Sequence, residues 1–68
     1  MAKVLVTGAA GVIGTAVLKQ LKDKYDLVAL DRDEVTGVDS VIADVSDFDA
    51  VREAMVGVDV VVHLAGVK

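Results

Sequence analysis

A glycine-rich segment near the N-terminus has the spacing of an anion-binding turn. Residues 7–14 read TGAAGVIG and follow a run of apolar residues. Gly8 permits a tight turn, Gly11 lets backbone N–H groups approach a ligand closely, and Gly14 lets a helix pack against a strand. A helix that begins inside the segment has N–H groups without partners, and these favour an anion without any lysine. The segment predicts a pyrophosphate site, and the alternative is a turn whose glycines serve packing alone.

An acidic residue after the second apolar run completes this pattern. Asp31 is placed where a carboxylate can accept hydrogen bonds from both hydroxyls of an adenosine ribose, and it would repel a 2′-phosphate. Arg32 follows at once, and its positive charge can partly offset that repulsion. The two residues predict NAD as the cofactor, with NADP less favoured. The alternative is that Asp31 is merely a polar residue that ends a strand.

Composition excludes several other kinds of site. The chain has 68 residues, 7 basic and 11 acidic, with a net charge of −4, which argues against nucleic-acid or anionic-membrane partners. It has no cysteine and one histidine, so disulfides, thiol catalysis and multi-ligand zinc sites are not expected. The acidic pair Asp31 and Asp33 lies in a strand-end turn and is not expected to bind metal. The lack of cysteine agrees with a cytoplasmic location, and no run is long enough to span a membrane.

Alternating apolar runs and helical patterns predict the elements that position these residues. Strands are predicted at Lys3–Thr7, Leu27–Leu30, Val41–Ala43 and Val58–Leu64. These runs are apolar nearly throughout, which is typical of parallel strands covered on both faces. Helical spacing of apolar residues from Ile13 to Leu21 predicts the first helix, and Arg32 to Ser40 is expected to form a loop.

A second helix is predicted at Asp47–Val56. Ser46 and Asp49 resemble a capping box, and Gly57 is placed where a C-terminal cap belongs.

Together these elements predict an α/β fold. Right-handed crossovers give a partial Rossmann, or doubly wound, fold, in which a four-stranded parallel sheet of order 3-2-1-4 carries one helix on each face. The fourth strand would then lie at an open edge, although it is the most apolar. We therefore expect residues 1–68 to be the truncated N-terminal portion of an NAD-binding domain, or a piece that self-associates.

The sequence resembles the extended short-chain dehydrogenases, the NAD-dependent epimerase/dehydratase group. The resemblance lies in residues 7–14, Asp31, Asp44-Val45 and the closing residues 63–66. The resemblance implies that the amides from Ala10 to Ile13 hold the pyrophosphate, that Asp44 meets the adenine amino group, and that Val45 packs on the adenine ring. It also implies that residues 64–66 line the nicotinamide-side ribose. The closing string through Lys68 is similar to the segment of UDP-galactose 4-epimerases whose lysine reaches the cofactor. The expected cofactor-binding residues are Gly8, Ala10, Gly11, Val12, Ile13, Gly14, Asp31, Arg32, Asp44, Val45, Leu64, Ala65, Gly66 and Lys68.

Two of the polar residues have simpler interpretations. Asp44 could only terminate a strand and start a turn. His63 ends an apolar strand with no partner acid or nucleophile nearby in sequence, so we interpret it as a packed structural histidine and not as a general base.

Catalytic residues are not found in this sequence. The family resemblance implies a Tyr-x-x-x-Lys pair for proton transfer, but Tyr25, the one tyrosine, is followed four residues later by Ala29. We expect the chain to be the dinucleotide-binding portion of an epimerase, dehydratase or dehydrogenase that acts on a nucleotide sugar or related hydroxyl substrate. We expect it to bind the dinucleotide but not to catalyse the reaction alone. The alternatives are a non-enzymatic Rossmann fragment that self-associates through its exposed strand, and an enzyme active only as an oligomer.

Overall fold

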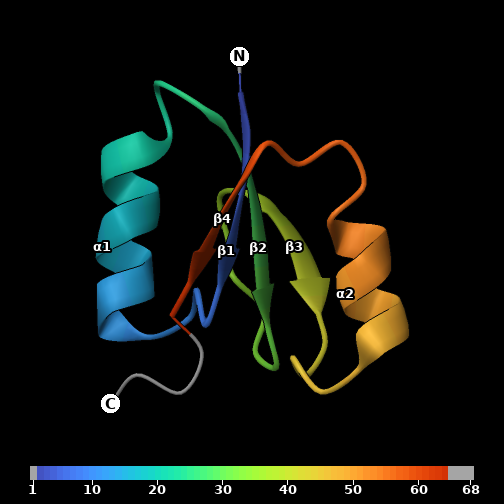
Figure 1. Ribbon diagram of the computed structural model, residues 1–68. Helices are drawn as coiled ribbons and strands as arrows, with labels where there is room; N and C mark the ends of the chain where they lie inside the picture. Colours follow the sequence, from blue (N-terminus) through green and yellow to red (C-terminus); the bar gives the residue numbers. More distant parts are fainter. Residues whose placement is uncertain (1, 65–68) are drawn as a thin grey trace.

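The structure, a computed structural model, describes residues 2–64 and contains a four-stranded parallel sheet (Figure 1). The elements in chain order are β1 (Lys3–Thr7), α1 (Val12–Leu21), β2 (Asp26–Asp31), β3 (Asp39–Ile42), α2 (Phe48–Ala54) and β4 (Val60–His63). The strand order is β3-β2-β1-β4, and every neighbouring pair is parallel. The predicted order and the α/β class are therefore confirmed.

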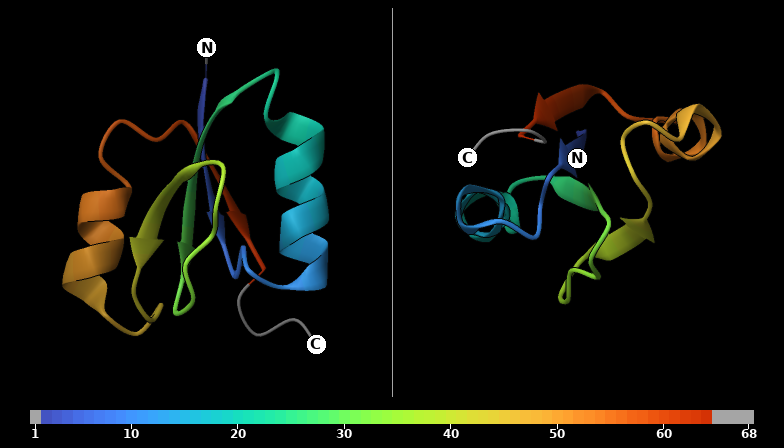
Figure 2. Two further views of the ribbon diagram at one scale, coloured as in Figure 1. Left: turned by 180° about the vertical axis from the view of Figure 1, so that it is seen from behind. Right: turned by 90° about the horizontal axis from the view of Figure 1, so that it is seen from below.

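The two helices lie on opposite sides of the sheet, as the views from behind and from below show (Figure 2). Strand residues alternate between the two faces, so the central strands β1 and β2 are buried on both. Val4, Val6 and Leu27 pack with Leu18 of α1, whereas Leu5, Val28 and Leu30 pack with Ala54 of α2. This double burial explains why both strands are apolar nearly throughout.

The boundaries of three strands differ from the prediction because backbone pairing, and not hydropathy, ends a strand. β2 extends to Asp26 and Asp31, which pair with Lys3 and Ile42. β3 begins at Asp39 and stops at Ile42, before the predicted end at Ala43. β4 is shorter than predicted, since the N–H of Val58 bonds to the Met55 carbonyl in the preceding turn.

The predicted N-cap of α2 is wrong by one residue. Asp47 is the N-cap, and its carboxylate accepts a hydrogen bond of 3.2 Å from the N–H of Ala50. Ser46 instead belongs to the preceding turn, where its N–H donates to Oδ1 of Asp44. At the other end of the helix the C-cap is Met55. Gly57 follows in the turn toward β4 with φ of +75°, a conformation that favours glycine.

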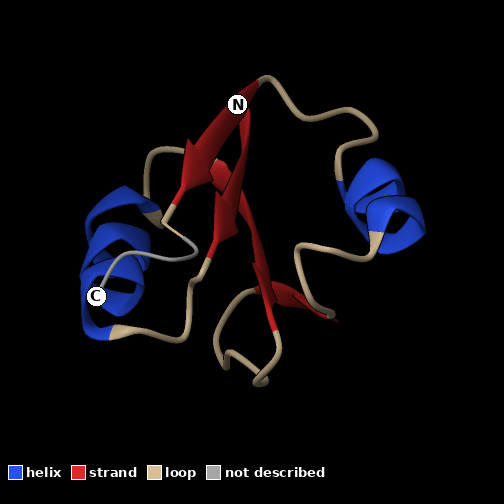
Figure 3. Cartoon of the chain, turned by 60° about the horizontal axis from the view of Figure 1, so that its bottom comes forward, coloured by secondary structure: helices blue, strands red, loops and turns tan. Residues whose placement is uncertain are grey.

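β4 forms an outer edge of the sheet. In the described part of the chain it pairs with β1 alone, and Val60 and Val61 are 50% and 42% exposed. The cartoon coloured by secondary structure shows the strands running between the two helices (Figure 3). Neither of the helices in residues 2–64 is long and apolar enough to cross a bilayer.

Candidate functional site

The carboxyl ends of all four strands lie at one edge of the sheet, where the arrowheads in Figure 1 gather. The strand order reverses between β1 and β4, because α1 leads to one side of β1 and α2 returns to the other. In open α/β sheets, ligands bind outside the carboxyl ends of the strands at such a reversal. The glycine-rich turn, Asp31, Asp44 and His63 all follow or end strands at this edge.

Gly8 makes the turn that leaves β1. Its φ is +69°, in the left-handed region that favours glycine, and its N–H donates a 3.0 Å hydrogen bond to the Leu30 carbonyl of β2. The Gly8 carbonyl in turn accepts from the N–H of Gly11 at 3.3 Å. The tight turn predicted at Gly8 is confirmed.

Gly14 and Gly11 have different requirements for space. A Cβ at Gly14 would lie 2.6 Å from both the Ala9 Cα and the Gly8 carbonyl oxygen, so the close packing of α1 on the turn requires glycine there. Among residues 2–64, a Cβ at Gly11 would meet only the Gly8 carbonyl oxygen, at an ordinary 3.6 Å. The protein's own packing therefore does not require glycine at position 11, and the backbone there is open to a ligand.

The amides from Ala10 to Ile13, expected to face a pyrophosphate, fall into two groups. The N–H of Ala10 donates to Oδ2 of Asp31 at 3.0 Å, and that of Gly11 donates to the Gly8 carbonyl. Within residues 2–64, the N–H groups of Val12 and Ile13 have no acceptor. These two amides form the first turn of α1, where the helix dipole favours an anion.

Asp31 is held by the turn on one side and by its own loop on the other. Its Oδ2 accepts from Ala10, and its Oδ1 accepts from the N–H of Asp33 at 3.2 Å. Partial burial raises the pKa of Asp31. Hydrogen bonds from the N–H groups of Ala10, Asp33 and Arg32, together with the positive charge of Arg32, lower it. The lowering is larger than the effect of burial, so the pKa lies below its ordinary value. The carboxylate is therefore charged at neutral pH and can accept further hydrogen bonds.

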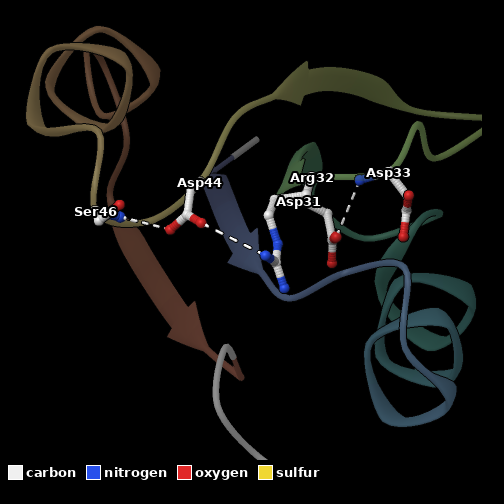
Figure 4. Close-up of polar contacts among 5 residues, drawn as sticks. All are labelled: Asp31, Arg32, Asp33, Asp44 and Ser46. Carbon is white, nitrogen blue, oxygen red and sulfur yellow. Dashed lines mark hydrogen bonds and ion pairs between the residues drawn. The ribbon is translucent and has the colours of Figure 1, made fainter.

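Arg32 points toward the next turn (Figure 4). One guanidinium nitrogen lies 3.8 Å from Oδ2 of Asp44, and Oδ1 of Asp44 accepts a 2.9 Å hydrogen bond from the N–H of Ser46. The pKa of Asp44 is lowered first by the N–H and hydroxyl of Ser46 and then by the charge of Arg32. The strand-ending turn suggested for Asp44 is thus present, and its ion pair with Arg32 is an additional contact.

The remaining predicted contacts lie around this edge. Val45 is 37% exposed after Asp44. Leu64 packs against the core cluster on the α1 face, and its N–H donates to the Thr7 carbonyl. Ala65, Gly66 and Lys68 lie outside the described residues.

His63 has a partner that was not predicted from the sequence. The hydroxyl of Thr7, which is buried, and Nδ1 of His63 share a 2.6 Å hydrogen bond across the carboxyl ends of β1 and β4. His63 is exposed, so the interpretation as a packed histidine is wrong. Its partner could have been found from the strand order, because the parallel register places His63 opposite Thr7.

The chemistry of these strand ends fits the pyrophosphate and one ribose of a dinucleotide. The N–H donors of Val12 and Ile13, which have no acceptor within residues 2–64, suit an anionic pyrophosphate, and a charged carboxylate suits the two hydroxyl donors of a ribose. Tyr25 precedes β2 at the opposite edge of the sheet, far along the strand from these groups.

Comparisons with known proteins agree with this assignment. Residues 4–68 match the NAD dependent epimerase/dehydratase family. L-arabinose 1-dehydrogenase (NAD(P)(+)) of Haloferax volcanii is 48% identical over 65 residues, which cover 96% of this chain and 26% of that enzyme. NAD-dependent glucose-6-phosphate dehydrogenase of the same organism is 46% identical, with 93% of this chain and 28% of that enzyme covered. The chain thus spans about a quarter of the length of these curated relatives.

Solved structures show the same fold. Uronate dehydrogenase from Agrobacterium tumefaciens superposes with a TM-score of 0.86 at 33% identity, covering all of this chain and 27% of that one. A mutant of that enzyme in complex with NAD gives a TM-score of 0.87. UDP-N-acetylglucosamine 4-epimerase from Bacillus cereus gives 0.81 at 29% identity, covering 96% of this chain and 24% of that one.

Proposed function

The chain belongs to the NAD dependent epimerase/dehydratase family, and from this we propose that it binds NAD through the turn at residues 8–14 and the carboxylate of Asp31. The observation that carries the proposal is the connection between the two halves of the site. The N–H of Ala10 bonds to Asp31, while the first two amides of α1, those of Val12 and Ile13, have no acceptor within residues 2–64. Donors for a pyrophosphate thus lie beside an acceptor for a ribose.

Different residues of the site would contact different parts of the coenzyme. Val12 and Ile13 would hold the pyrophosphate, with Gly11 leaving the space for it, and Asp31 would hold the adenosine ribose. The family resemblance adds Asp44 and Val45 at the adenine, and Leu64, Ala65, Gly66 and Lys68 toward the nicotinamide. When bound, NAD supplies a hydride acceptor; the groups described here orient the coenzyme and move no proton.

NAD is the preferred coenzyme in this proposal. The charged carboxylate of Asp31 accepts from ribose hydroxyls and repels a 2′-phosphate. The whole protein is, on this proposal, a dehydrogenase, epimerase or dehydratase that acts on a sugar or similar hydroxyl substrate, as its named relatives suggest. The absence of cysteine supports a cytoplasmic location.

Isothermal titration calorimetry with NAD and NADP tests the proposal. We expect saturable heat with both coenzymes and tighter binding of NAD, and we expect Asp31→Ala to lose most of the NAD affinity. Asp39→Ala is the matched control, because Asp39 is an exposed carboxylate at the amino end of β3, away from the site. Absence of saturation in a sample with the circular dichroism of a folded α/β protein would contradict binding, as would an equal loss of affinity in the control.

Self-association through β4 is a second candidate function. The observation that favours it is an edge strand that pairs with β1 alone and carries the half-exposed Val60 and Val61. An edge of this kind offers unpaired backbone groups and apolar surface to a second copy of the chain. The two functions are compatible, because only the carboxyl end of β4 belongs to the proposed coenzyme site.

A further inference from the structure

Arg32 is the cation best placed in the sequence to attract a 2′-phosphate, but its contact is elsewhere. Its guanidinium lies 3.8 Å from Oδ2 of Asp44, which is the only ion pair within residues 2–64 (Figure 4). The arginine side chain is 79% exposed, so it is not confined by packing. Within residues 2–64 the ion pair with Asp44 is the contact that the structure shows for the guanidinium, and removing the charge of that partner should release it.

Asp44 is a fixed anion. Its Oδ1 accepts the N–H of Ser46 in a turn closed by the side chain, which leaves Oδ2 for Arg32. The N–H of Ala43, the residue before Asp44, donates a 2.9 Å hydrogen bond to the carbonyl of Asp31, the residue before Arg32. The backbones that carry the two charges are thus joined directly, and the ion pair spans neighbouring strand ends.

We propose that Asp44 is a positioning residue for coenzyme selectivity: it holds the Arg32 guanidinium and thereby withholds it from a 2′-phosphate at the Asp31 ribose site. This inference rests on the proposed function. With Arg32 engaged, a 2′-phosphate meets the negative charge of Asp31 without a free counter-charge beside it. Neutralising Asp44 frees Arg32, the cation next to Asp31 in the sequence, and NADP should benefit while NAD gains nothing from it.

The ratio of the two affinities isolates this effect. NAD and NADP share the adenine ring, so any contact that Asp44 makes with adenine contributes equally to both and cancels in the ratio. Asp44→Asn is the suitable change because asparagine keeps the side-chain oxygen that accepts from Ser46 and removes only the charge. The pair is exposed and weak, so we expect the NADP:NAD affinity ratio to rise by about two- to fivefold.

The experiment is a calorimetric titration of NAD and NADP into the wild-type chain, Asp44→Asn, Arg32→Ala and the double variant. We expect the ratio to rise in Asp44→Asn, to change little in Arg32→Ala, and to show no rise when Asp44→Asn is made in the Arg32→Ala background. Asp33→Asn is the matched control, because it removes a carboxylate on the other side of Arg32 that forms no ion pair with it. That variant should leave the ratio near the wild-type value.

Each of the following results would overturn the proposal. An unchanged ratio in Asp44→Asn, or an equal rise in Asp33→Asn or in the Arg32→Ala background, would mean that Asp44 does not act through Arg32. A large loss of NADP affinity in Arg32→Ala alone would mean that Arg32 already reaches the 2′-phosphate. This outcome can be measured even if the Asp44 variants do not fold. Failure of the wild-type chain to bind either coenzyme would overturn the proposed function as well, so the two failures are distinguishable.

Discussion

The N–H of Ala10 and Oδ2 of Asp31 form a 3.0 Å hydrogen bond between the glycine-rich turn and the end of β2. The carboxylate expected to hold a ribose is therefore already bonded to the turn expected to hold a pyrophosphate. One further amide of the turn, that of Gly11, is used internally, whereas those of Val12 and Ile13 have no acceptor in the described part of the chain. The turn and the carboxylate thus form a connected unit that is shaped before any ligand binds, which lowers the ordering cost of binding.

The two glycines of the motif should respond differently to alanine. Gly14→Ala places a Cβ 2.6 Å from the Ala9 Cα and the Gly8 carbonyl oxygen, and we expect it to destabilise the fold by about 1–3 kcal/mol. Gly11→Ala meets only an ordinary 3.6 Å contact, and its effect should stay within about 1 kcal/mol. Urea denaturation of both variants checks this. Equal losses would mean that α1 does not pack on the turn as described.

Gly11→Val should separate folding from binding. The added side chain projects where the backbone is open, so we expect a melting curve close to that of the wild type and loss of NAD binding by calorimetry. Undiminished NAD affinity in this variant would show that the ligand does not approach the turn at residue 11.

Acid should weaken the fold through Asp31. The pKa of this carboxyl is lowered in the folded protein, so the unfolded chain takes up the proton first, and the stabilisation present at neutral pH is lost as the pH falls below the ordinary value of 3.8. Urea midpoints measured from neutral pH down to about pH 3 should fall most at the acid end. Asp31→Asn should flatten this fall, whereas Asp23→Asn, in the exposed turn after α1, should keep it. An undiminished fall in Asp31→Asn would refute the assignment.

Thr7 and His63 should be coupled energetically. Thr7→Val removes the hydroxyl that shares a hydrogen bond with Nδ1 of His63, and we expect a coupling of about 0.5–1.5 kcal/mol in a double-mutant cycle with His63→Ala. Urea denaturation of the four proteins measures it. Additive single effects would mean that this contact does not stabilise the junction of β1 and β4.

Self-association through β4 should be blocked by a charge on the edge. Val61→Lys puts an ammonium group on a strand with no outer neighbour, and light scattering should report a smaller species than for the wild type at the same concentration. Val56→Lys, at an exposed position in the loop after α2, is the control. A wild-type monomer at all concentrations would rule out the second candidate function.

Much of the fold was predictable from the sequence because burial and handedness leave few choices. Strands apolar on both faces require helices on both sides, and right-handed crossovers then fix the order β3-β2-β1-β4. The limits of the elements were less predictable. Val58 is as apolar as the residues of β4 but bonds to the preceding turn, and Asp39 is polar but pairs with Val28 in β3. Hydropathy does not report such pairings.

The site was predictable in its residue types but not in their contacts. The spacing of the glycines indicated their tasks at Gly8 and Gly14, which the backbone confirms. The bond from Ala10 to Asp31 and the pairing of Arg32 with Asp44 depend on how neighbouring strand ends meet in space, which no single segment of sequence contains. The shift of the N-cap from Ser46 to Asp47 likewise depends on the turn at Asp44, to which the N–H of Ser46 is bonded.

Backbone amide NMR during a titration with NAD tests the central claim most directly. In ¹⁵N–¹H correlation spectra of the chain, we predict that the cross-peaks of Val12 and Ile13 shift most and saturate together with the calorimetric binding curve. The Ala10 peak should shift as well, because the ribose engages the carboxylate to which its N–H is bonded. Saturable binding that leaves the Val12 and Ile13 peaks in place, or a folded chain whose spectrum does not respond to NAD, would contradict the account.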